Sequence, residues 1–221
     1  NNDLSEEFLT KKDDYNFVQV DSSNIKSAIK QITDLSLEKG LDERNVQVLA
    51  PMYKGEAGID ALNNTLQEIY NPPKNNKEEV IYGEYVYREG DKVLQLVNDL
   101  DNNVFNGDIG FIESITGNKI IINFDGNRVE YEKKDLKQIK HAYAISIHKS
   151  QGSEFMHVIL PISKSYYKML YNKLIYTGVS RAKKSLTLVG DAAAFQRAVG
   201  NNYSSGRKTS LKEQISIVYN N

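Results

Sequence analysis

The chain has no cysteine, no tryptophan and only three histidines among its 221 residues. Without cysteine there is no disulfide framework, no thiolate ligand for zinc and no cysteine nucleophile. Three scattered histidines do not supply a zinc site either. We therefore expect no metal ligands in this chain.

Long apolar runs and an excess of one charge are also missing. No stretch of about 18 apolar residues and no signal peptide is present, which predicts a cytoplasmic protein with no membrane partner. Lysine and arginine number 28 against 29 for aspartate and glutamate, so the formal net charge is -1. Any nucleic-acid site must therefore be a local patch. The chain begins with Asn1 rather than methionine, and we expect it to be a piece of a longer protein.

Two stretches of the chain alternate apolar runs with helical spacing. "YNFVQV" and "VQVLAP" predict strands, and each is followed by a predicted helix. The first helix would be capped by Ser22 or Ser23 and stop at Gly40, and the second would cover "IDALNNTLQEIY". The same rhythm returns later with the strands "AYAISI", "HVILPI" and "SLTLVG", a helix at about 165 to 182, and a last helix ending at Gly200. This order predicts an α/β fold with a parallel sheet covered by helices.

Between these stretches, from about Tyr85 to Ile139, short alternating strands are punctuated by glycine or asparagine. Their spacing predicts a small antiparallel β-barrel. We therefore expect a discontinuous α/β domain over residues 1–84 and 140–221, with a barrel inserted over residues 85–139. A simpler interpretation of the barrel is a spacer or folding module.

Three polar loops belong to the predicted α/β domain: "MYKGEAG" after 46–51, "HKSQGSEF" after 142–147, and "TGVSRAKK" before the last strand. Ligands of open α/β sheets bind outside the carboxyl ends of the strands, and we expect all three loops to converge there. They share cations, glycines and small hydroxyls, a set that suits phosphate. These residues are Lys54, Gly55, Gly58, Lys149, Ser150, Gly152, Ser153, Ser180 and Arg181.

Each loop also has a simpler interpretation. Lys54 or Arg181, taken singly, fits an ordinary solvated surface. "HKSQGSEF" is harder to explain in this way, because a long polar loop between two buried strands is uncommon without function. The tyrosines of "YYKMLY" (166–171) would either pack or stack on bases.

A complete ATPase site is missing. "GNNYSSGRKTS" (200–210) looks like a P-loop, but five residues separate its glycines where four are required, and Arg207 stands where lysine is required. No apolar strand ends in Asp-Glu to hold Mg²⁺. A nuclease is also poorly supported, because Asp99, Asp101 and Asp108 form no two-metal pattern.

Four blocks carry a resemblance to a known family. "AYAISIHKSQGSEFMHVILPI" and "LIYTGVSRAKKSLTLVGD" resemble motifs V and VI of superfamily 1 helicases, and the chain from about Asn45 onward is similar to RecD-like DNA helicases, which are related to the exodeoxyribonuclease V alpha subunit. "VLAPMYKGEAGIDALNNTLQEIYNP" is similar to the motif IV region. "GDKVLQLVND" with "VFNGDIGFI" looks like the inserted Src-homology-type barrel, and "RKTSLKEQI" looks like the family's tail. Gly178 and Ser180 replace the expected alanine and threonine.

The resemblance implies the second of two RecA-like domains of an ATP-dependent helicase that moves 5′ to 3′ on DNA. The first domain of the same polypeptide would carry the Walker motifs and the Mg²⁺ ligands. In this chain Arg181 would be the arginine finger, and Lys54 would be a second cation at the ATP phosphates. Gly152 and Glu154 would line the nucleotide, with Glu154 accepting a ribose hydroxyl.

The same resemblance implies the DNA contacts. Single-stranded DNA and duplex junctions would be the partners, and the barrel, with "VFNGD" (104–108) as its most motif-like loop, would help to split the duplex. The residues that would face single-stranded DNA are His148, Lys149, Ser150 and Gln151. The alternative is a non-catalytic module that binds DNA or a partner and hydrolyses nothing.

Overall fold

The computed structural model describes residues 6–166 and 169–201, and every structural statement below concerns this part of the chain. Its larger domain contains a five-stranded sheet in the order β1-β12-β11-β2-β10, in which all neighbouring strands are parallel. This confirms the α/β prediction. The strands are β1 (Tyr15–Gln19), β2 (Val46–Ala50), β10 (Ala144–Ser146), β11 (Phe155–Ile162) and β12 (Ala182–Gly190).

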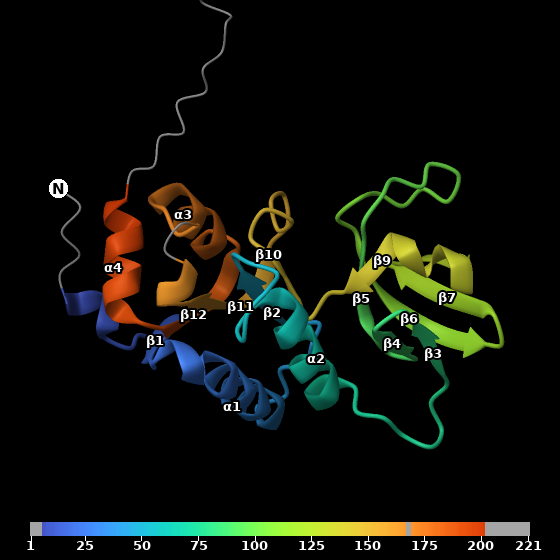
Figure 1. Ribbon diagram of the computed structural model, residues 1–221, viewed down its shortest axis with the longest axis horizontal. Coiled ribbons are helices and arrows are strands. Elements are labelled where there is room, and N and C mark those ends of the chain that lie inside the picture. The colour runs from blue at the N-terminus through green and yellow to red at the C-terminus, as the bar shows by residue number, and fades with distance from the viewer. Residues whose placement is uncertain (1–5, 167–168, 202–221) are drawn as a thin grey trace, which may run out of the picture.

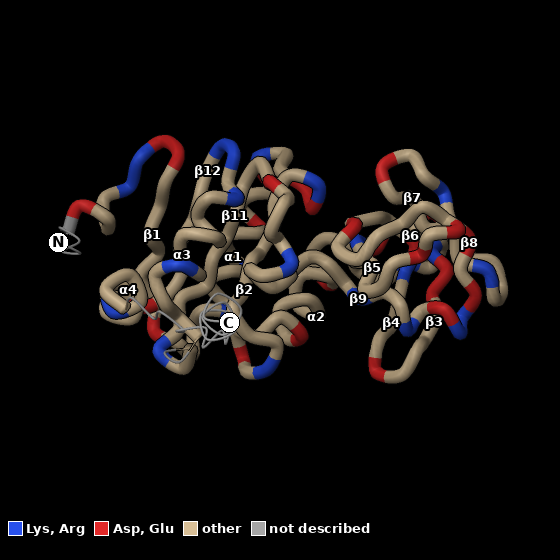
Figure 2. The backbone as a smooth tube through the Cα atoms, turned by 90° about the horizontal axis from the view of Figure 1, so that it is seen from above, with Lys and Arg blue, Asp and Glu red and all other residues tan. Residues whose placement is uncertain are grey.

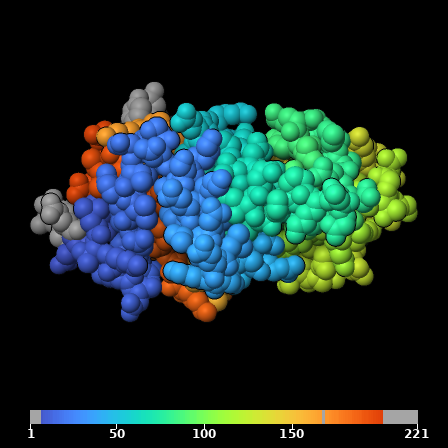
Figure 3. All heavy atoms as spheres, turned by 90° about the horizontal axis from the view of Figure 1, so that it is seen from below, coloured from blue at the N-terminus to red at the C-terminus, as the bar shows by residue number. Residues whose placement is uncertain are grey.

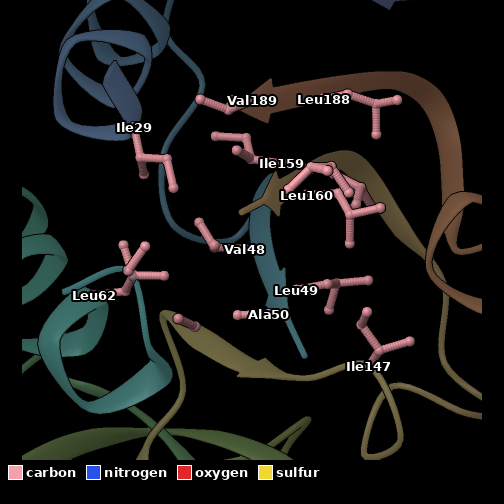
Figure 4. Close-up of a cluster of buried hydrophobic side chains, with 14 of the residues drawn as sticks. Ile29, Val48, Leu49, Ala50, Leu62, Ile147, Ile159, Leu160, Leu188 and Val189 are labelled. Atoms are coloured by element: carbon pink, nitrogen blue, oxygen red, sulfur yellow. The ribbon is translucent and has the colours of Figure 1, made fainter. Parts of the chain in front are cut away.

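Helices cover both faces of this sheet (Figure 1). α1 (Ile25–Glu38) and α2 (Ile59–Tyr70) lie on one face, and α3 (Asn172–Val179) and α4 (Ala192–Gly200) lie on the other. All five residues of β2 are buried, as expected of a strand with neighbours on both sides and helices on both faces. Side chains from α1, α2 and the central strands fill the core between these layers (Figure 4).

The smaller domain is the inserted barrel, which follows α2 and returns the chain to β10 (Figure 1). It has an antiparallel five-stranded sheet in the order β8-β7-β6-β5-β9 and a hairpin of β3 and β4, which share one apolar core. A 3₁₀ turn, Lys133–Gln138, joins β8 to β9. The strands are β3 (Glu79–Tyr82), β4 (Tyr85–Arg88), β5 (Lys92–Gln95), β6 (Ile109–Thr116), β7 (Lys119–Phe124), β8 (Asn127–Glu132) and β9 (Ile139–His141).

The barrel extends slightly beyond the predicted 85–139. β3 pairs with β4, and its Val80 belongs to the barrel core. At the other end β9 pairs with β5 as far as His141. The chain therefore enters the barrel near Glu79 and leaves it near His141, because strand pairing rather than glycine spacing sets these limits.

Two predicted helix features are wrong. α1 has Asn24 as its N-cap, because a 3₁₀ turn over Ser22–Asn24 precedes the helix. The single helix predicted at about 165 to 182 is a 3₁₀ turn, Lys164–Tyr166, and the short helix α3. The extended backbone of Tyr171 immediately precedes α3 and ends any continuous helix there. Part of "YYKMLY" and all of "RKTSLKEQI" lie outside the described residues.

Two adjacent charged residues at the start of β5 are buried against the α/β domain. The Asp91 carboxylate accepts hydrogen bonds from Gln67 (2.6 Å) and Asn71 (2.7 Å) of the α2 segment, and from Tyr143 (2.9 Å). Its Oδ2 also lies 3.2 Å from His141 Nε2. Burial alone would raise the pKa of the Asp91 carboxyl, but the hydrogen bonds and the charge of His141 hold it below its usual range.

Lys92 is the second of these residues, and it is 3% exposed. Its ammonium donates to the Glu43 carbonyl at 2.7 Å and to Gln47 Oε1 at 2.9 Å. Burial lowers the pKa of Lys92 to about 8. Seen from below, the first half of the chain and the barrel form one continuous surface (Figure 3). The hydrogen bonds of Asp91 and Lys92 to the α/β domain hold the barrel against it.

Candidate functional site

The loop between β10 and β11, residues 147–154, joins opposite edges of the parallel sheet. β2 lies between these two strands and runs parallel to both, so no tight turn could connect them. The loop leaves β10 at the carboxyl edge and enters β11 at the amino edge. Part of its length is therefore a requirement of the topology, and it can present different residues at each edge.

At the carboxyl edge the loop meets the barrel. His148 is exposed, and Lys149 is half-buried, with its ammonium hydrogen-bonded to Asn106 Oδ1 of the barrel. Asn106 belongs to the "VFNGD" segment, whose Phe105 and Asn106 N–H groups are held by Asp108 and Asn98. Lys149 thus connects "HKSQGSEF" with "VFNGD", two segments that the sequence analysis identified separately.

Of the other two predicted DNA contacts, only Gln151 is exposed. Ser150 is 0% exposed, and its hydroxyl donates to the Ile147 carbonyl at 2.7 Å. The predicted DNA contact through this side chain is therefore wrong, because the hydroxyl is used to hold the turn.

At the amino edge the loop meets Arg181, which follows Ser180, the C-cap of α3. Its guanidinium is half-buried and donates to the Thr177 carbonyl (3.2 Å), the Ser153 carbonyl (3.0 Å) and Ser180 Oγ (3.1 Å). No ion pair among the described residues involves Arg181. Three neutral acceptors therefore hold the guanidinium in place without neutralising its charge. Such a cation is prepared for an anion.

Glu154 lies beside the same strand ends. Its carboxylate is 3.0 Å from Lys183 Nζ, and both side chains are about half exposed, so this ion pair contributes little and can exchange partners. Gly152, just before it, is exposed with a φ of +88°, a conformation that favours glycine. A backbone turn without a side chain therefore lies next to the charged groups.

The expected convergence of all three loops at the carboxyl edge is wrong. Arg181 precedes β12, so it lies at the amino edge. The register puts Ala50, at the end of β2, level with Val189, seven residues beyond Ala182. At about 3.3 Å per residue, the two ends are roughly 20 Å apart along the sheet. The structure therefore brings Arg181 together with Glu154 and not with Lys54.

Lys54 instead pairs with Asp60 at the start of α2. Its ammonium is 3.1 Å from Asp60 Oδ2, and the pKa of Lys54 is raised by its hydrogen bond to Asp60 and by the charge of Asp60, with a smaller effect from Glu84 of the barrel hairpin. The loop that carries Lys54 folds back on α2, since the N–H of Asp60 donates to the Tyr53 carbonyl at 3.2 Å. A Cβ on Gly58 would lie 2.5 Å from that carbonyl oxygen, so this fold of the loop requires glycine.

No group of three or more metal-ligating side chains occurs in the described part of the chain. None of its helices is both long enough and apolar enough to cross a membrane. Lysine and arginine are spread over both domains between acidic residues, so the cations at each edge are local features (Figure 2).

Sequence reasoning missed the contacts that hold the predicted residues in place. Lys183 pairs with Glu154, Thr177 and Ser153 hold Arg181 through backbone carbonyls, and Asn106 holds Lys149. Every residue has a backbone carbonyl, so contacts through the Thr177 and Ser153 carbonyls could not have been predicted from residue types. Asn106 could have been, because it lies in the quoted segment "VFNGD".

Two domain families match the chain over the regions just described. Residues 62–124 match the ATP-dependent RecD-like DNA helicase SH3 domain, and residues 141–189 match the UvrD-like helicase C-terminal domain. The chain carries the C-terminal domains of a RecD-like superfamily 1 helicase. The first match includes most of the barrel, and the second runs through the β10–β11 loop and Arg181.

Relatives agree with this assignment to the RecD-like helicases. The ATP-dependent RecD2 DNA helicase of Deinococcus radiodurans is 37% identical over 170 residues, which are 77% of this chain and 23% of that protein. The RecBCD enzyme subunit RecD of Buchnera aphidicola subsp. Acyrthosiphon pisum is 34% identical over 165 residues, 72% of this chain and 27% of that protein. The chain thus spans about a quarter of the length of these relatives.

Solved structures show the same fold at lower identity. A Pif1 helicase from Bacteroides in complex with ADP-AlF3 and single-stranded DNA superposes with a TM-score of 0.50 at 17% identity, over 91% of this chain and 55% of that one. A structure of two coordinating Pif1 helicases on forked DNA gives the same TM-score at 19% identity, over 91% and 52%. These likenesses confirm the RecA-like architecture of the α/β domain.

Proposed function

We propose that this chain is the second motor domain of an ATP-dependent DNA helicase that moves 5′ to 3′ on single-stranded DNA. The observation that carries this proposal is the β10–β11 loop. One end of the loop supplies the Ser153 carbonyl that holds Arg181, and the other end carries Lys149 against the barrel. A single segment of eight residues therefore connects a cation prepared for phosphate with a cation prepared for a DNA backbone.

The residues at the amino edge fit a nucleotide. Arg181 has an uncompensated planar cation, which suits the γ-phosphate, and Glu154 can leave its weak pair with Lys183 to accept a ribose hydroxyl. Gly152 leaves room for close backbone approach. Bound ATP supplies the free energy of phosphoryl transfer, and a first domain of the same polypeptide would supply the Walker motifs and the Mg²⁺ ligands.

At the carboxyl edge His148, Lys149 and Gln151 would hold the DNA backbone. When Arg181 binds or releases phosphate, its hydrogen bond to the Ser153 carbonyl changes. The loop then shifts in position, and this shift moves Lys149 at its other end. Backbone contacts of this kind give binding that is independent of sequence and sensitive to salt. The barrel would contact duplex junctions near Asn106.

The test is ATP hydrolysis with and without single-stranded DNA, in a protein that includes the segment preceding this chain. We expect DNA-stimulated hydrolysis, and Arg181→Ala should lower it by about 10³-fold, the usual loss for an arginine finger. Lys30→Ala, an exposed lysine of α1, is the matched control and should change it little. Retention of hydrolysis within threefold by Arg181→Ala would exclude the finger role.

The alternative is a DNA-binding or partner-binding module without catalysis. Absence of hydrolysis in the longer protein, together with retained DNA binding by this chain, would support it.

A further inference from the structure

A hollow lies at the junction of the two domains, beside the β10–β11 loop. The α/β domain contributes Tyr53, Asn64 and Ser146 to its lining, and the barrel segment contributes Tyr85, Leu94 and Lys140. None of these residues has a role in the contacts proposed above. The hollow therefore needs an explanation of its own.

Lys140 is the central feature of this hollow. Its Nζ lies 5.6 Å from the ring centroid of Tyr53 and 5.9 Å from that of Tyr85, close enough for a cation–π interaction with both rings. No ion pair among the described residues involves Lys140. Asp60 is the one carboxylate residue that lines the hollow, and it pairs with Lys54 at 3.1 Å. The half-buried ammonium of Lys140 is therefore positioned by aromatic rings and available to an anion.

Tyr53 presents an aromatic ring on a fixed turn. Tyr53 is 44% exposed, and its backbone is fixed by the hydrogen bond from Asp60 N and by the close approach of Gly58. A large apolar side chain that is both exposed and rigidly held loses little conformational entropy on binding. A rigid aromatic surface next to a cation is the combination with which proteins bind single-stranded nucleic acid.

The hollow continues directly from the predicted DNA contacts. Ser146 lines the hollow, and both its carbonyl (3.0 Å) and its hydroxyl (3.2 Å) accept the Lys149 N–H. Lys149 is thus bonded through its backbone to Ser146, and Lys140 of β9 lines the same hollow as Ser146. A single strand held at Lys149 would pass this hollow next.

We propose that Tyr53, Tyr85 and Lys140 form a second subsite for single-stranded DNA. One base stacks on Tyr53, the neighbouring phosphate pairs with Lys140, and Tyr85 positions the Lys140 ammonium. The subsite rests on the proposed function, because it extends the same DNA track across the domain junction. It makes the barrel part of the binding groove and gives Lys140 a role that a spacer module would not have.

The experiment measures binding of this 221-residue chain to a fluorescently labelled oligothymidylate by anisotropy, at several salt concentrations. Tyr53→Ala should weaken binding by about 5- to 100-fold, the range that corresponds to the loss of one base stack. Tyr53→Phe keeps the ring and should bind within twofold of the unaltered chain. Lys140→Ala should reduce the slope of log affinity against log salt by about 0.7.

Matched controls come from other surfaces of the chain. Tyr176 is 72% exposed on α3 and Lys30 is exposed on α1, so Tyr176→Ala and Lys30→Ala should leave binding unchanged. Melting temperatures show whether each variant is folded. If Tyr53→Ala does not fold, the salt slope of Lys140→Ala decides the question alone.

The failure of this inference differs from that of the proposed function. If Lys149→Ala weakens binding while Tyr53→Ala and Lys140→Ala bind as the unaltered chain does, the subsite is excluded and the motor proposal stands. Equal loss in Tyr53→Phe and Tyr53→Ala would also exclude base stacking. If the unaltered chain does not bind the oligonucleotide, both the subsite and the DNA track are excluded.

Discussion

Arg181 Nη1 donates to the carbonyl oxygen of Ser153 over 3.0 Å, and this bond joins the segment after α3 to the β10–β11 loop, which carries the candidate DNA contacts. The two residues are 28 positions apart in the sequence. Through this contact the candidate arginine finger is bonded directly to the candidate DNA-binding loop, so a movement of one displaces the other. Substitutions at Arg181 should therefore affect more than charge.

We expect Arg181→Lys to be nearly as damaging as Arg181→Ala. Lysine keeps the charge but lacks the planar fork that reaches Thr177, Ser153 and Ser180 together. DNA-stimulated ATP hydrolysis by the longer protein should fall by at least about 10²-fold, within the range seen for transition-state contacts. Recovery of more than half the rate by lysine would show that only charge matters at this position.

Lys149 should contribute to DNA binding as a single phosphate contact. Lys149→Ala should flatten the slope of log affinity against log salt by about 0.7 for single strands. Asn106→Ala removes only the partner that orients the ammonium, so it should weaken binding by a smaller factor and leave the slope unchanged. An unchanged slope in Lys149→Ala would show that Lys149 makes no phosphate contact and is an ordinary solvated lysine.

The buried Lys92 predicts a stability change in alkaline solution. Its folded pKa of about 8 lies below the unfolded value of about 10.4, so the folded state releases this proton first. Below pH 8 burial of the charged Lys92 therefore lowers the free energy of unfolding. This loss should disappear as pH rises from about 8 to 10.4, so the protein should become more stable across that range. The total gain is on the order of 3 kcal/mol.

Denaturant unfolding of the unaltered chain and Lys92→Met, compared at each pH, isolates this effect because the other groups are common to both. The difference in unfolding free energy should shift in favour of the unaltered chain as pH rises through that window. A difference that is constant from pH 7 to 10.5 would contradict the low pKa of Lys92.

Asp91 should be among the most sensitive positions of the chain. Asp91→Ala leaves Gln67, Asn71 and Tyr143 without their shared acceptor in a buried site, which should cost about 3 kcal/mol or more of unfolding free energy. Asp101→Ala, at an exposed position of the barrel, is the control and should change stability by less than about 0.5 kcal/mol. Similar unfolding midpoints for the two variants would show that the buried cluster does not hold the domains together.

The repeating patterns of the sequence were enough to predict most of the fold. β2 is buried along its whole length, and α2 covers the residues that its apolar spacing indicated. Buried positions recur regularly along a helix or strand, so the apolar residues that fill them recur regularly in the sequence. The helix at 165 to 182 could not be placed in this way, since the backbone at Tyr171 is extended and the apolar spacing of the segment gives no sign of this break. The helicase motifs likewise identified Arg181 and Lys149 as single residues without showing what holds them.

The sequence alone therefore determined the α/β order, the inserted barrel and the likeness to RecD-like helicases. Tertiary structure decided which residues act together. Parallel strand order put Arg181 with Glu154 at one edge and Lys54 with Asp60 at the other, and burial removed the Ser150 side chain from the predicted DNA contacts. Asp91 meets His141 across 50 residues, and Lys140 meets Tyr53 across the domain junction. Such pairs depend on the path of the chain in space, and neither partner carries a local signal of the other.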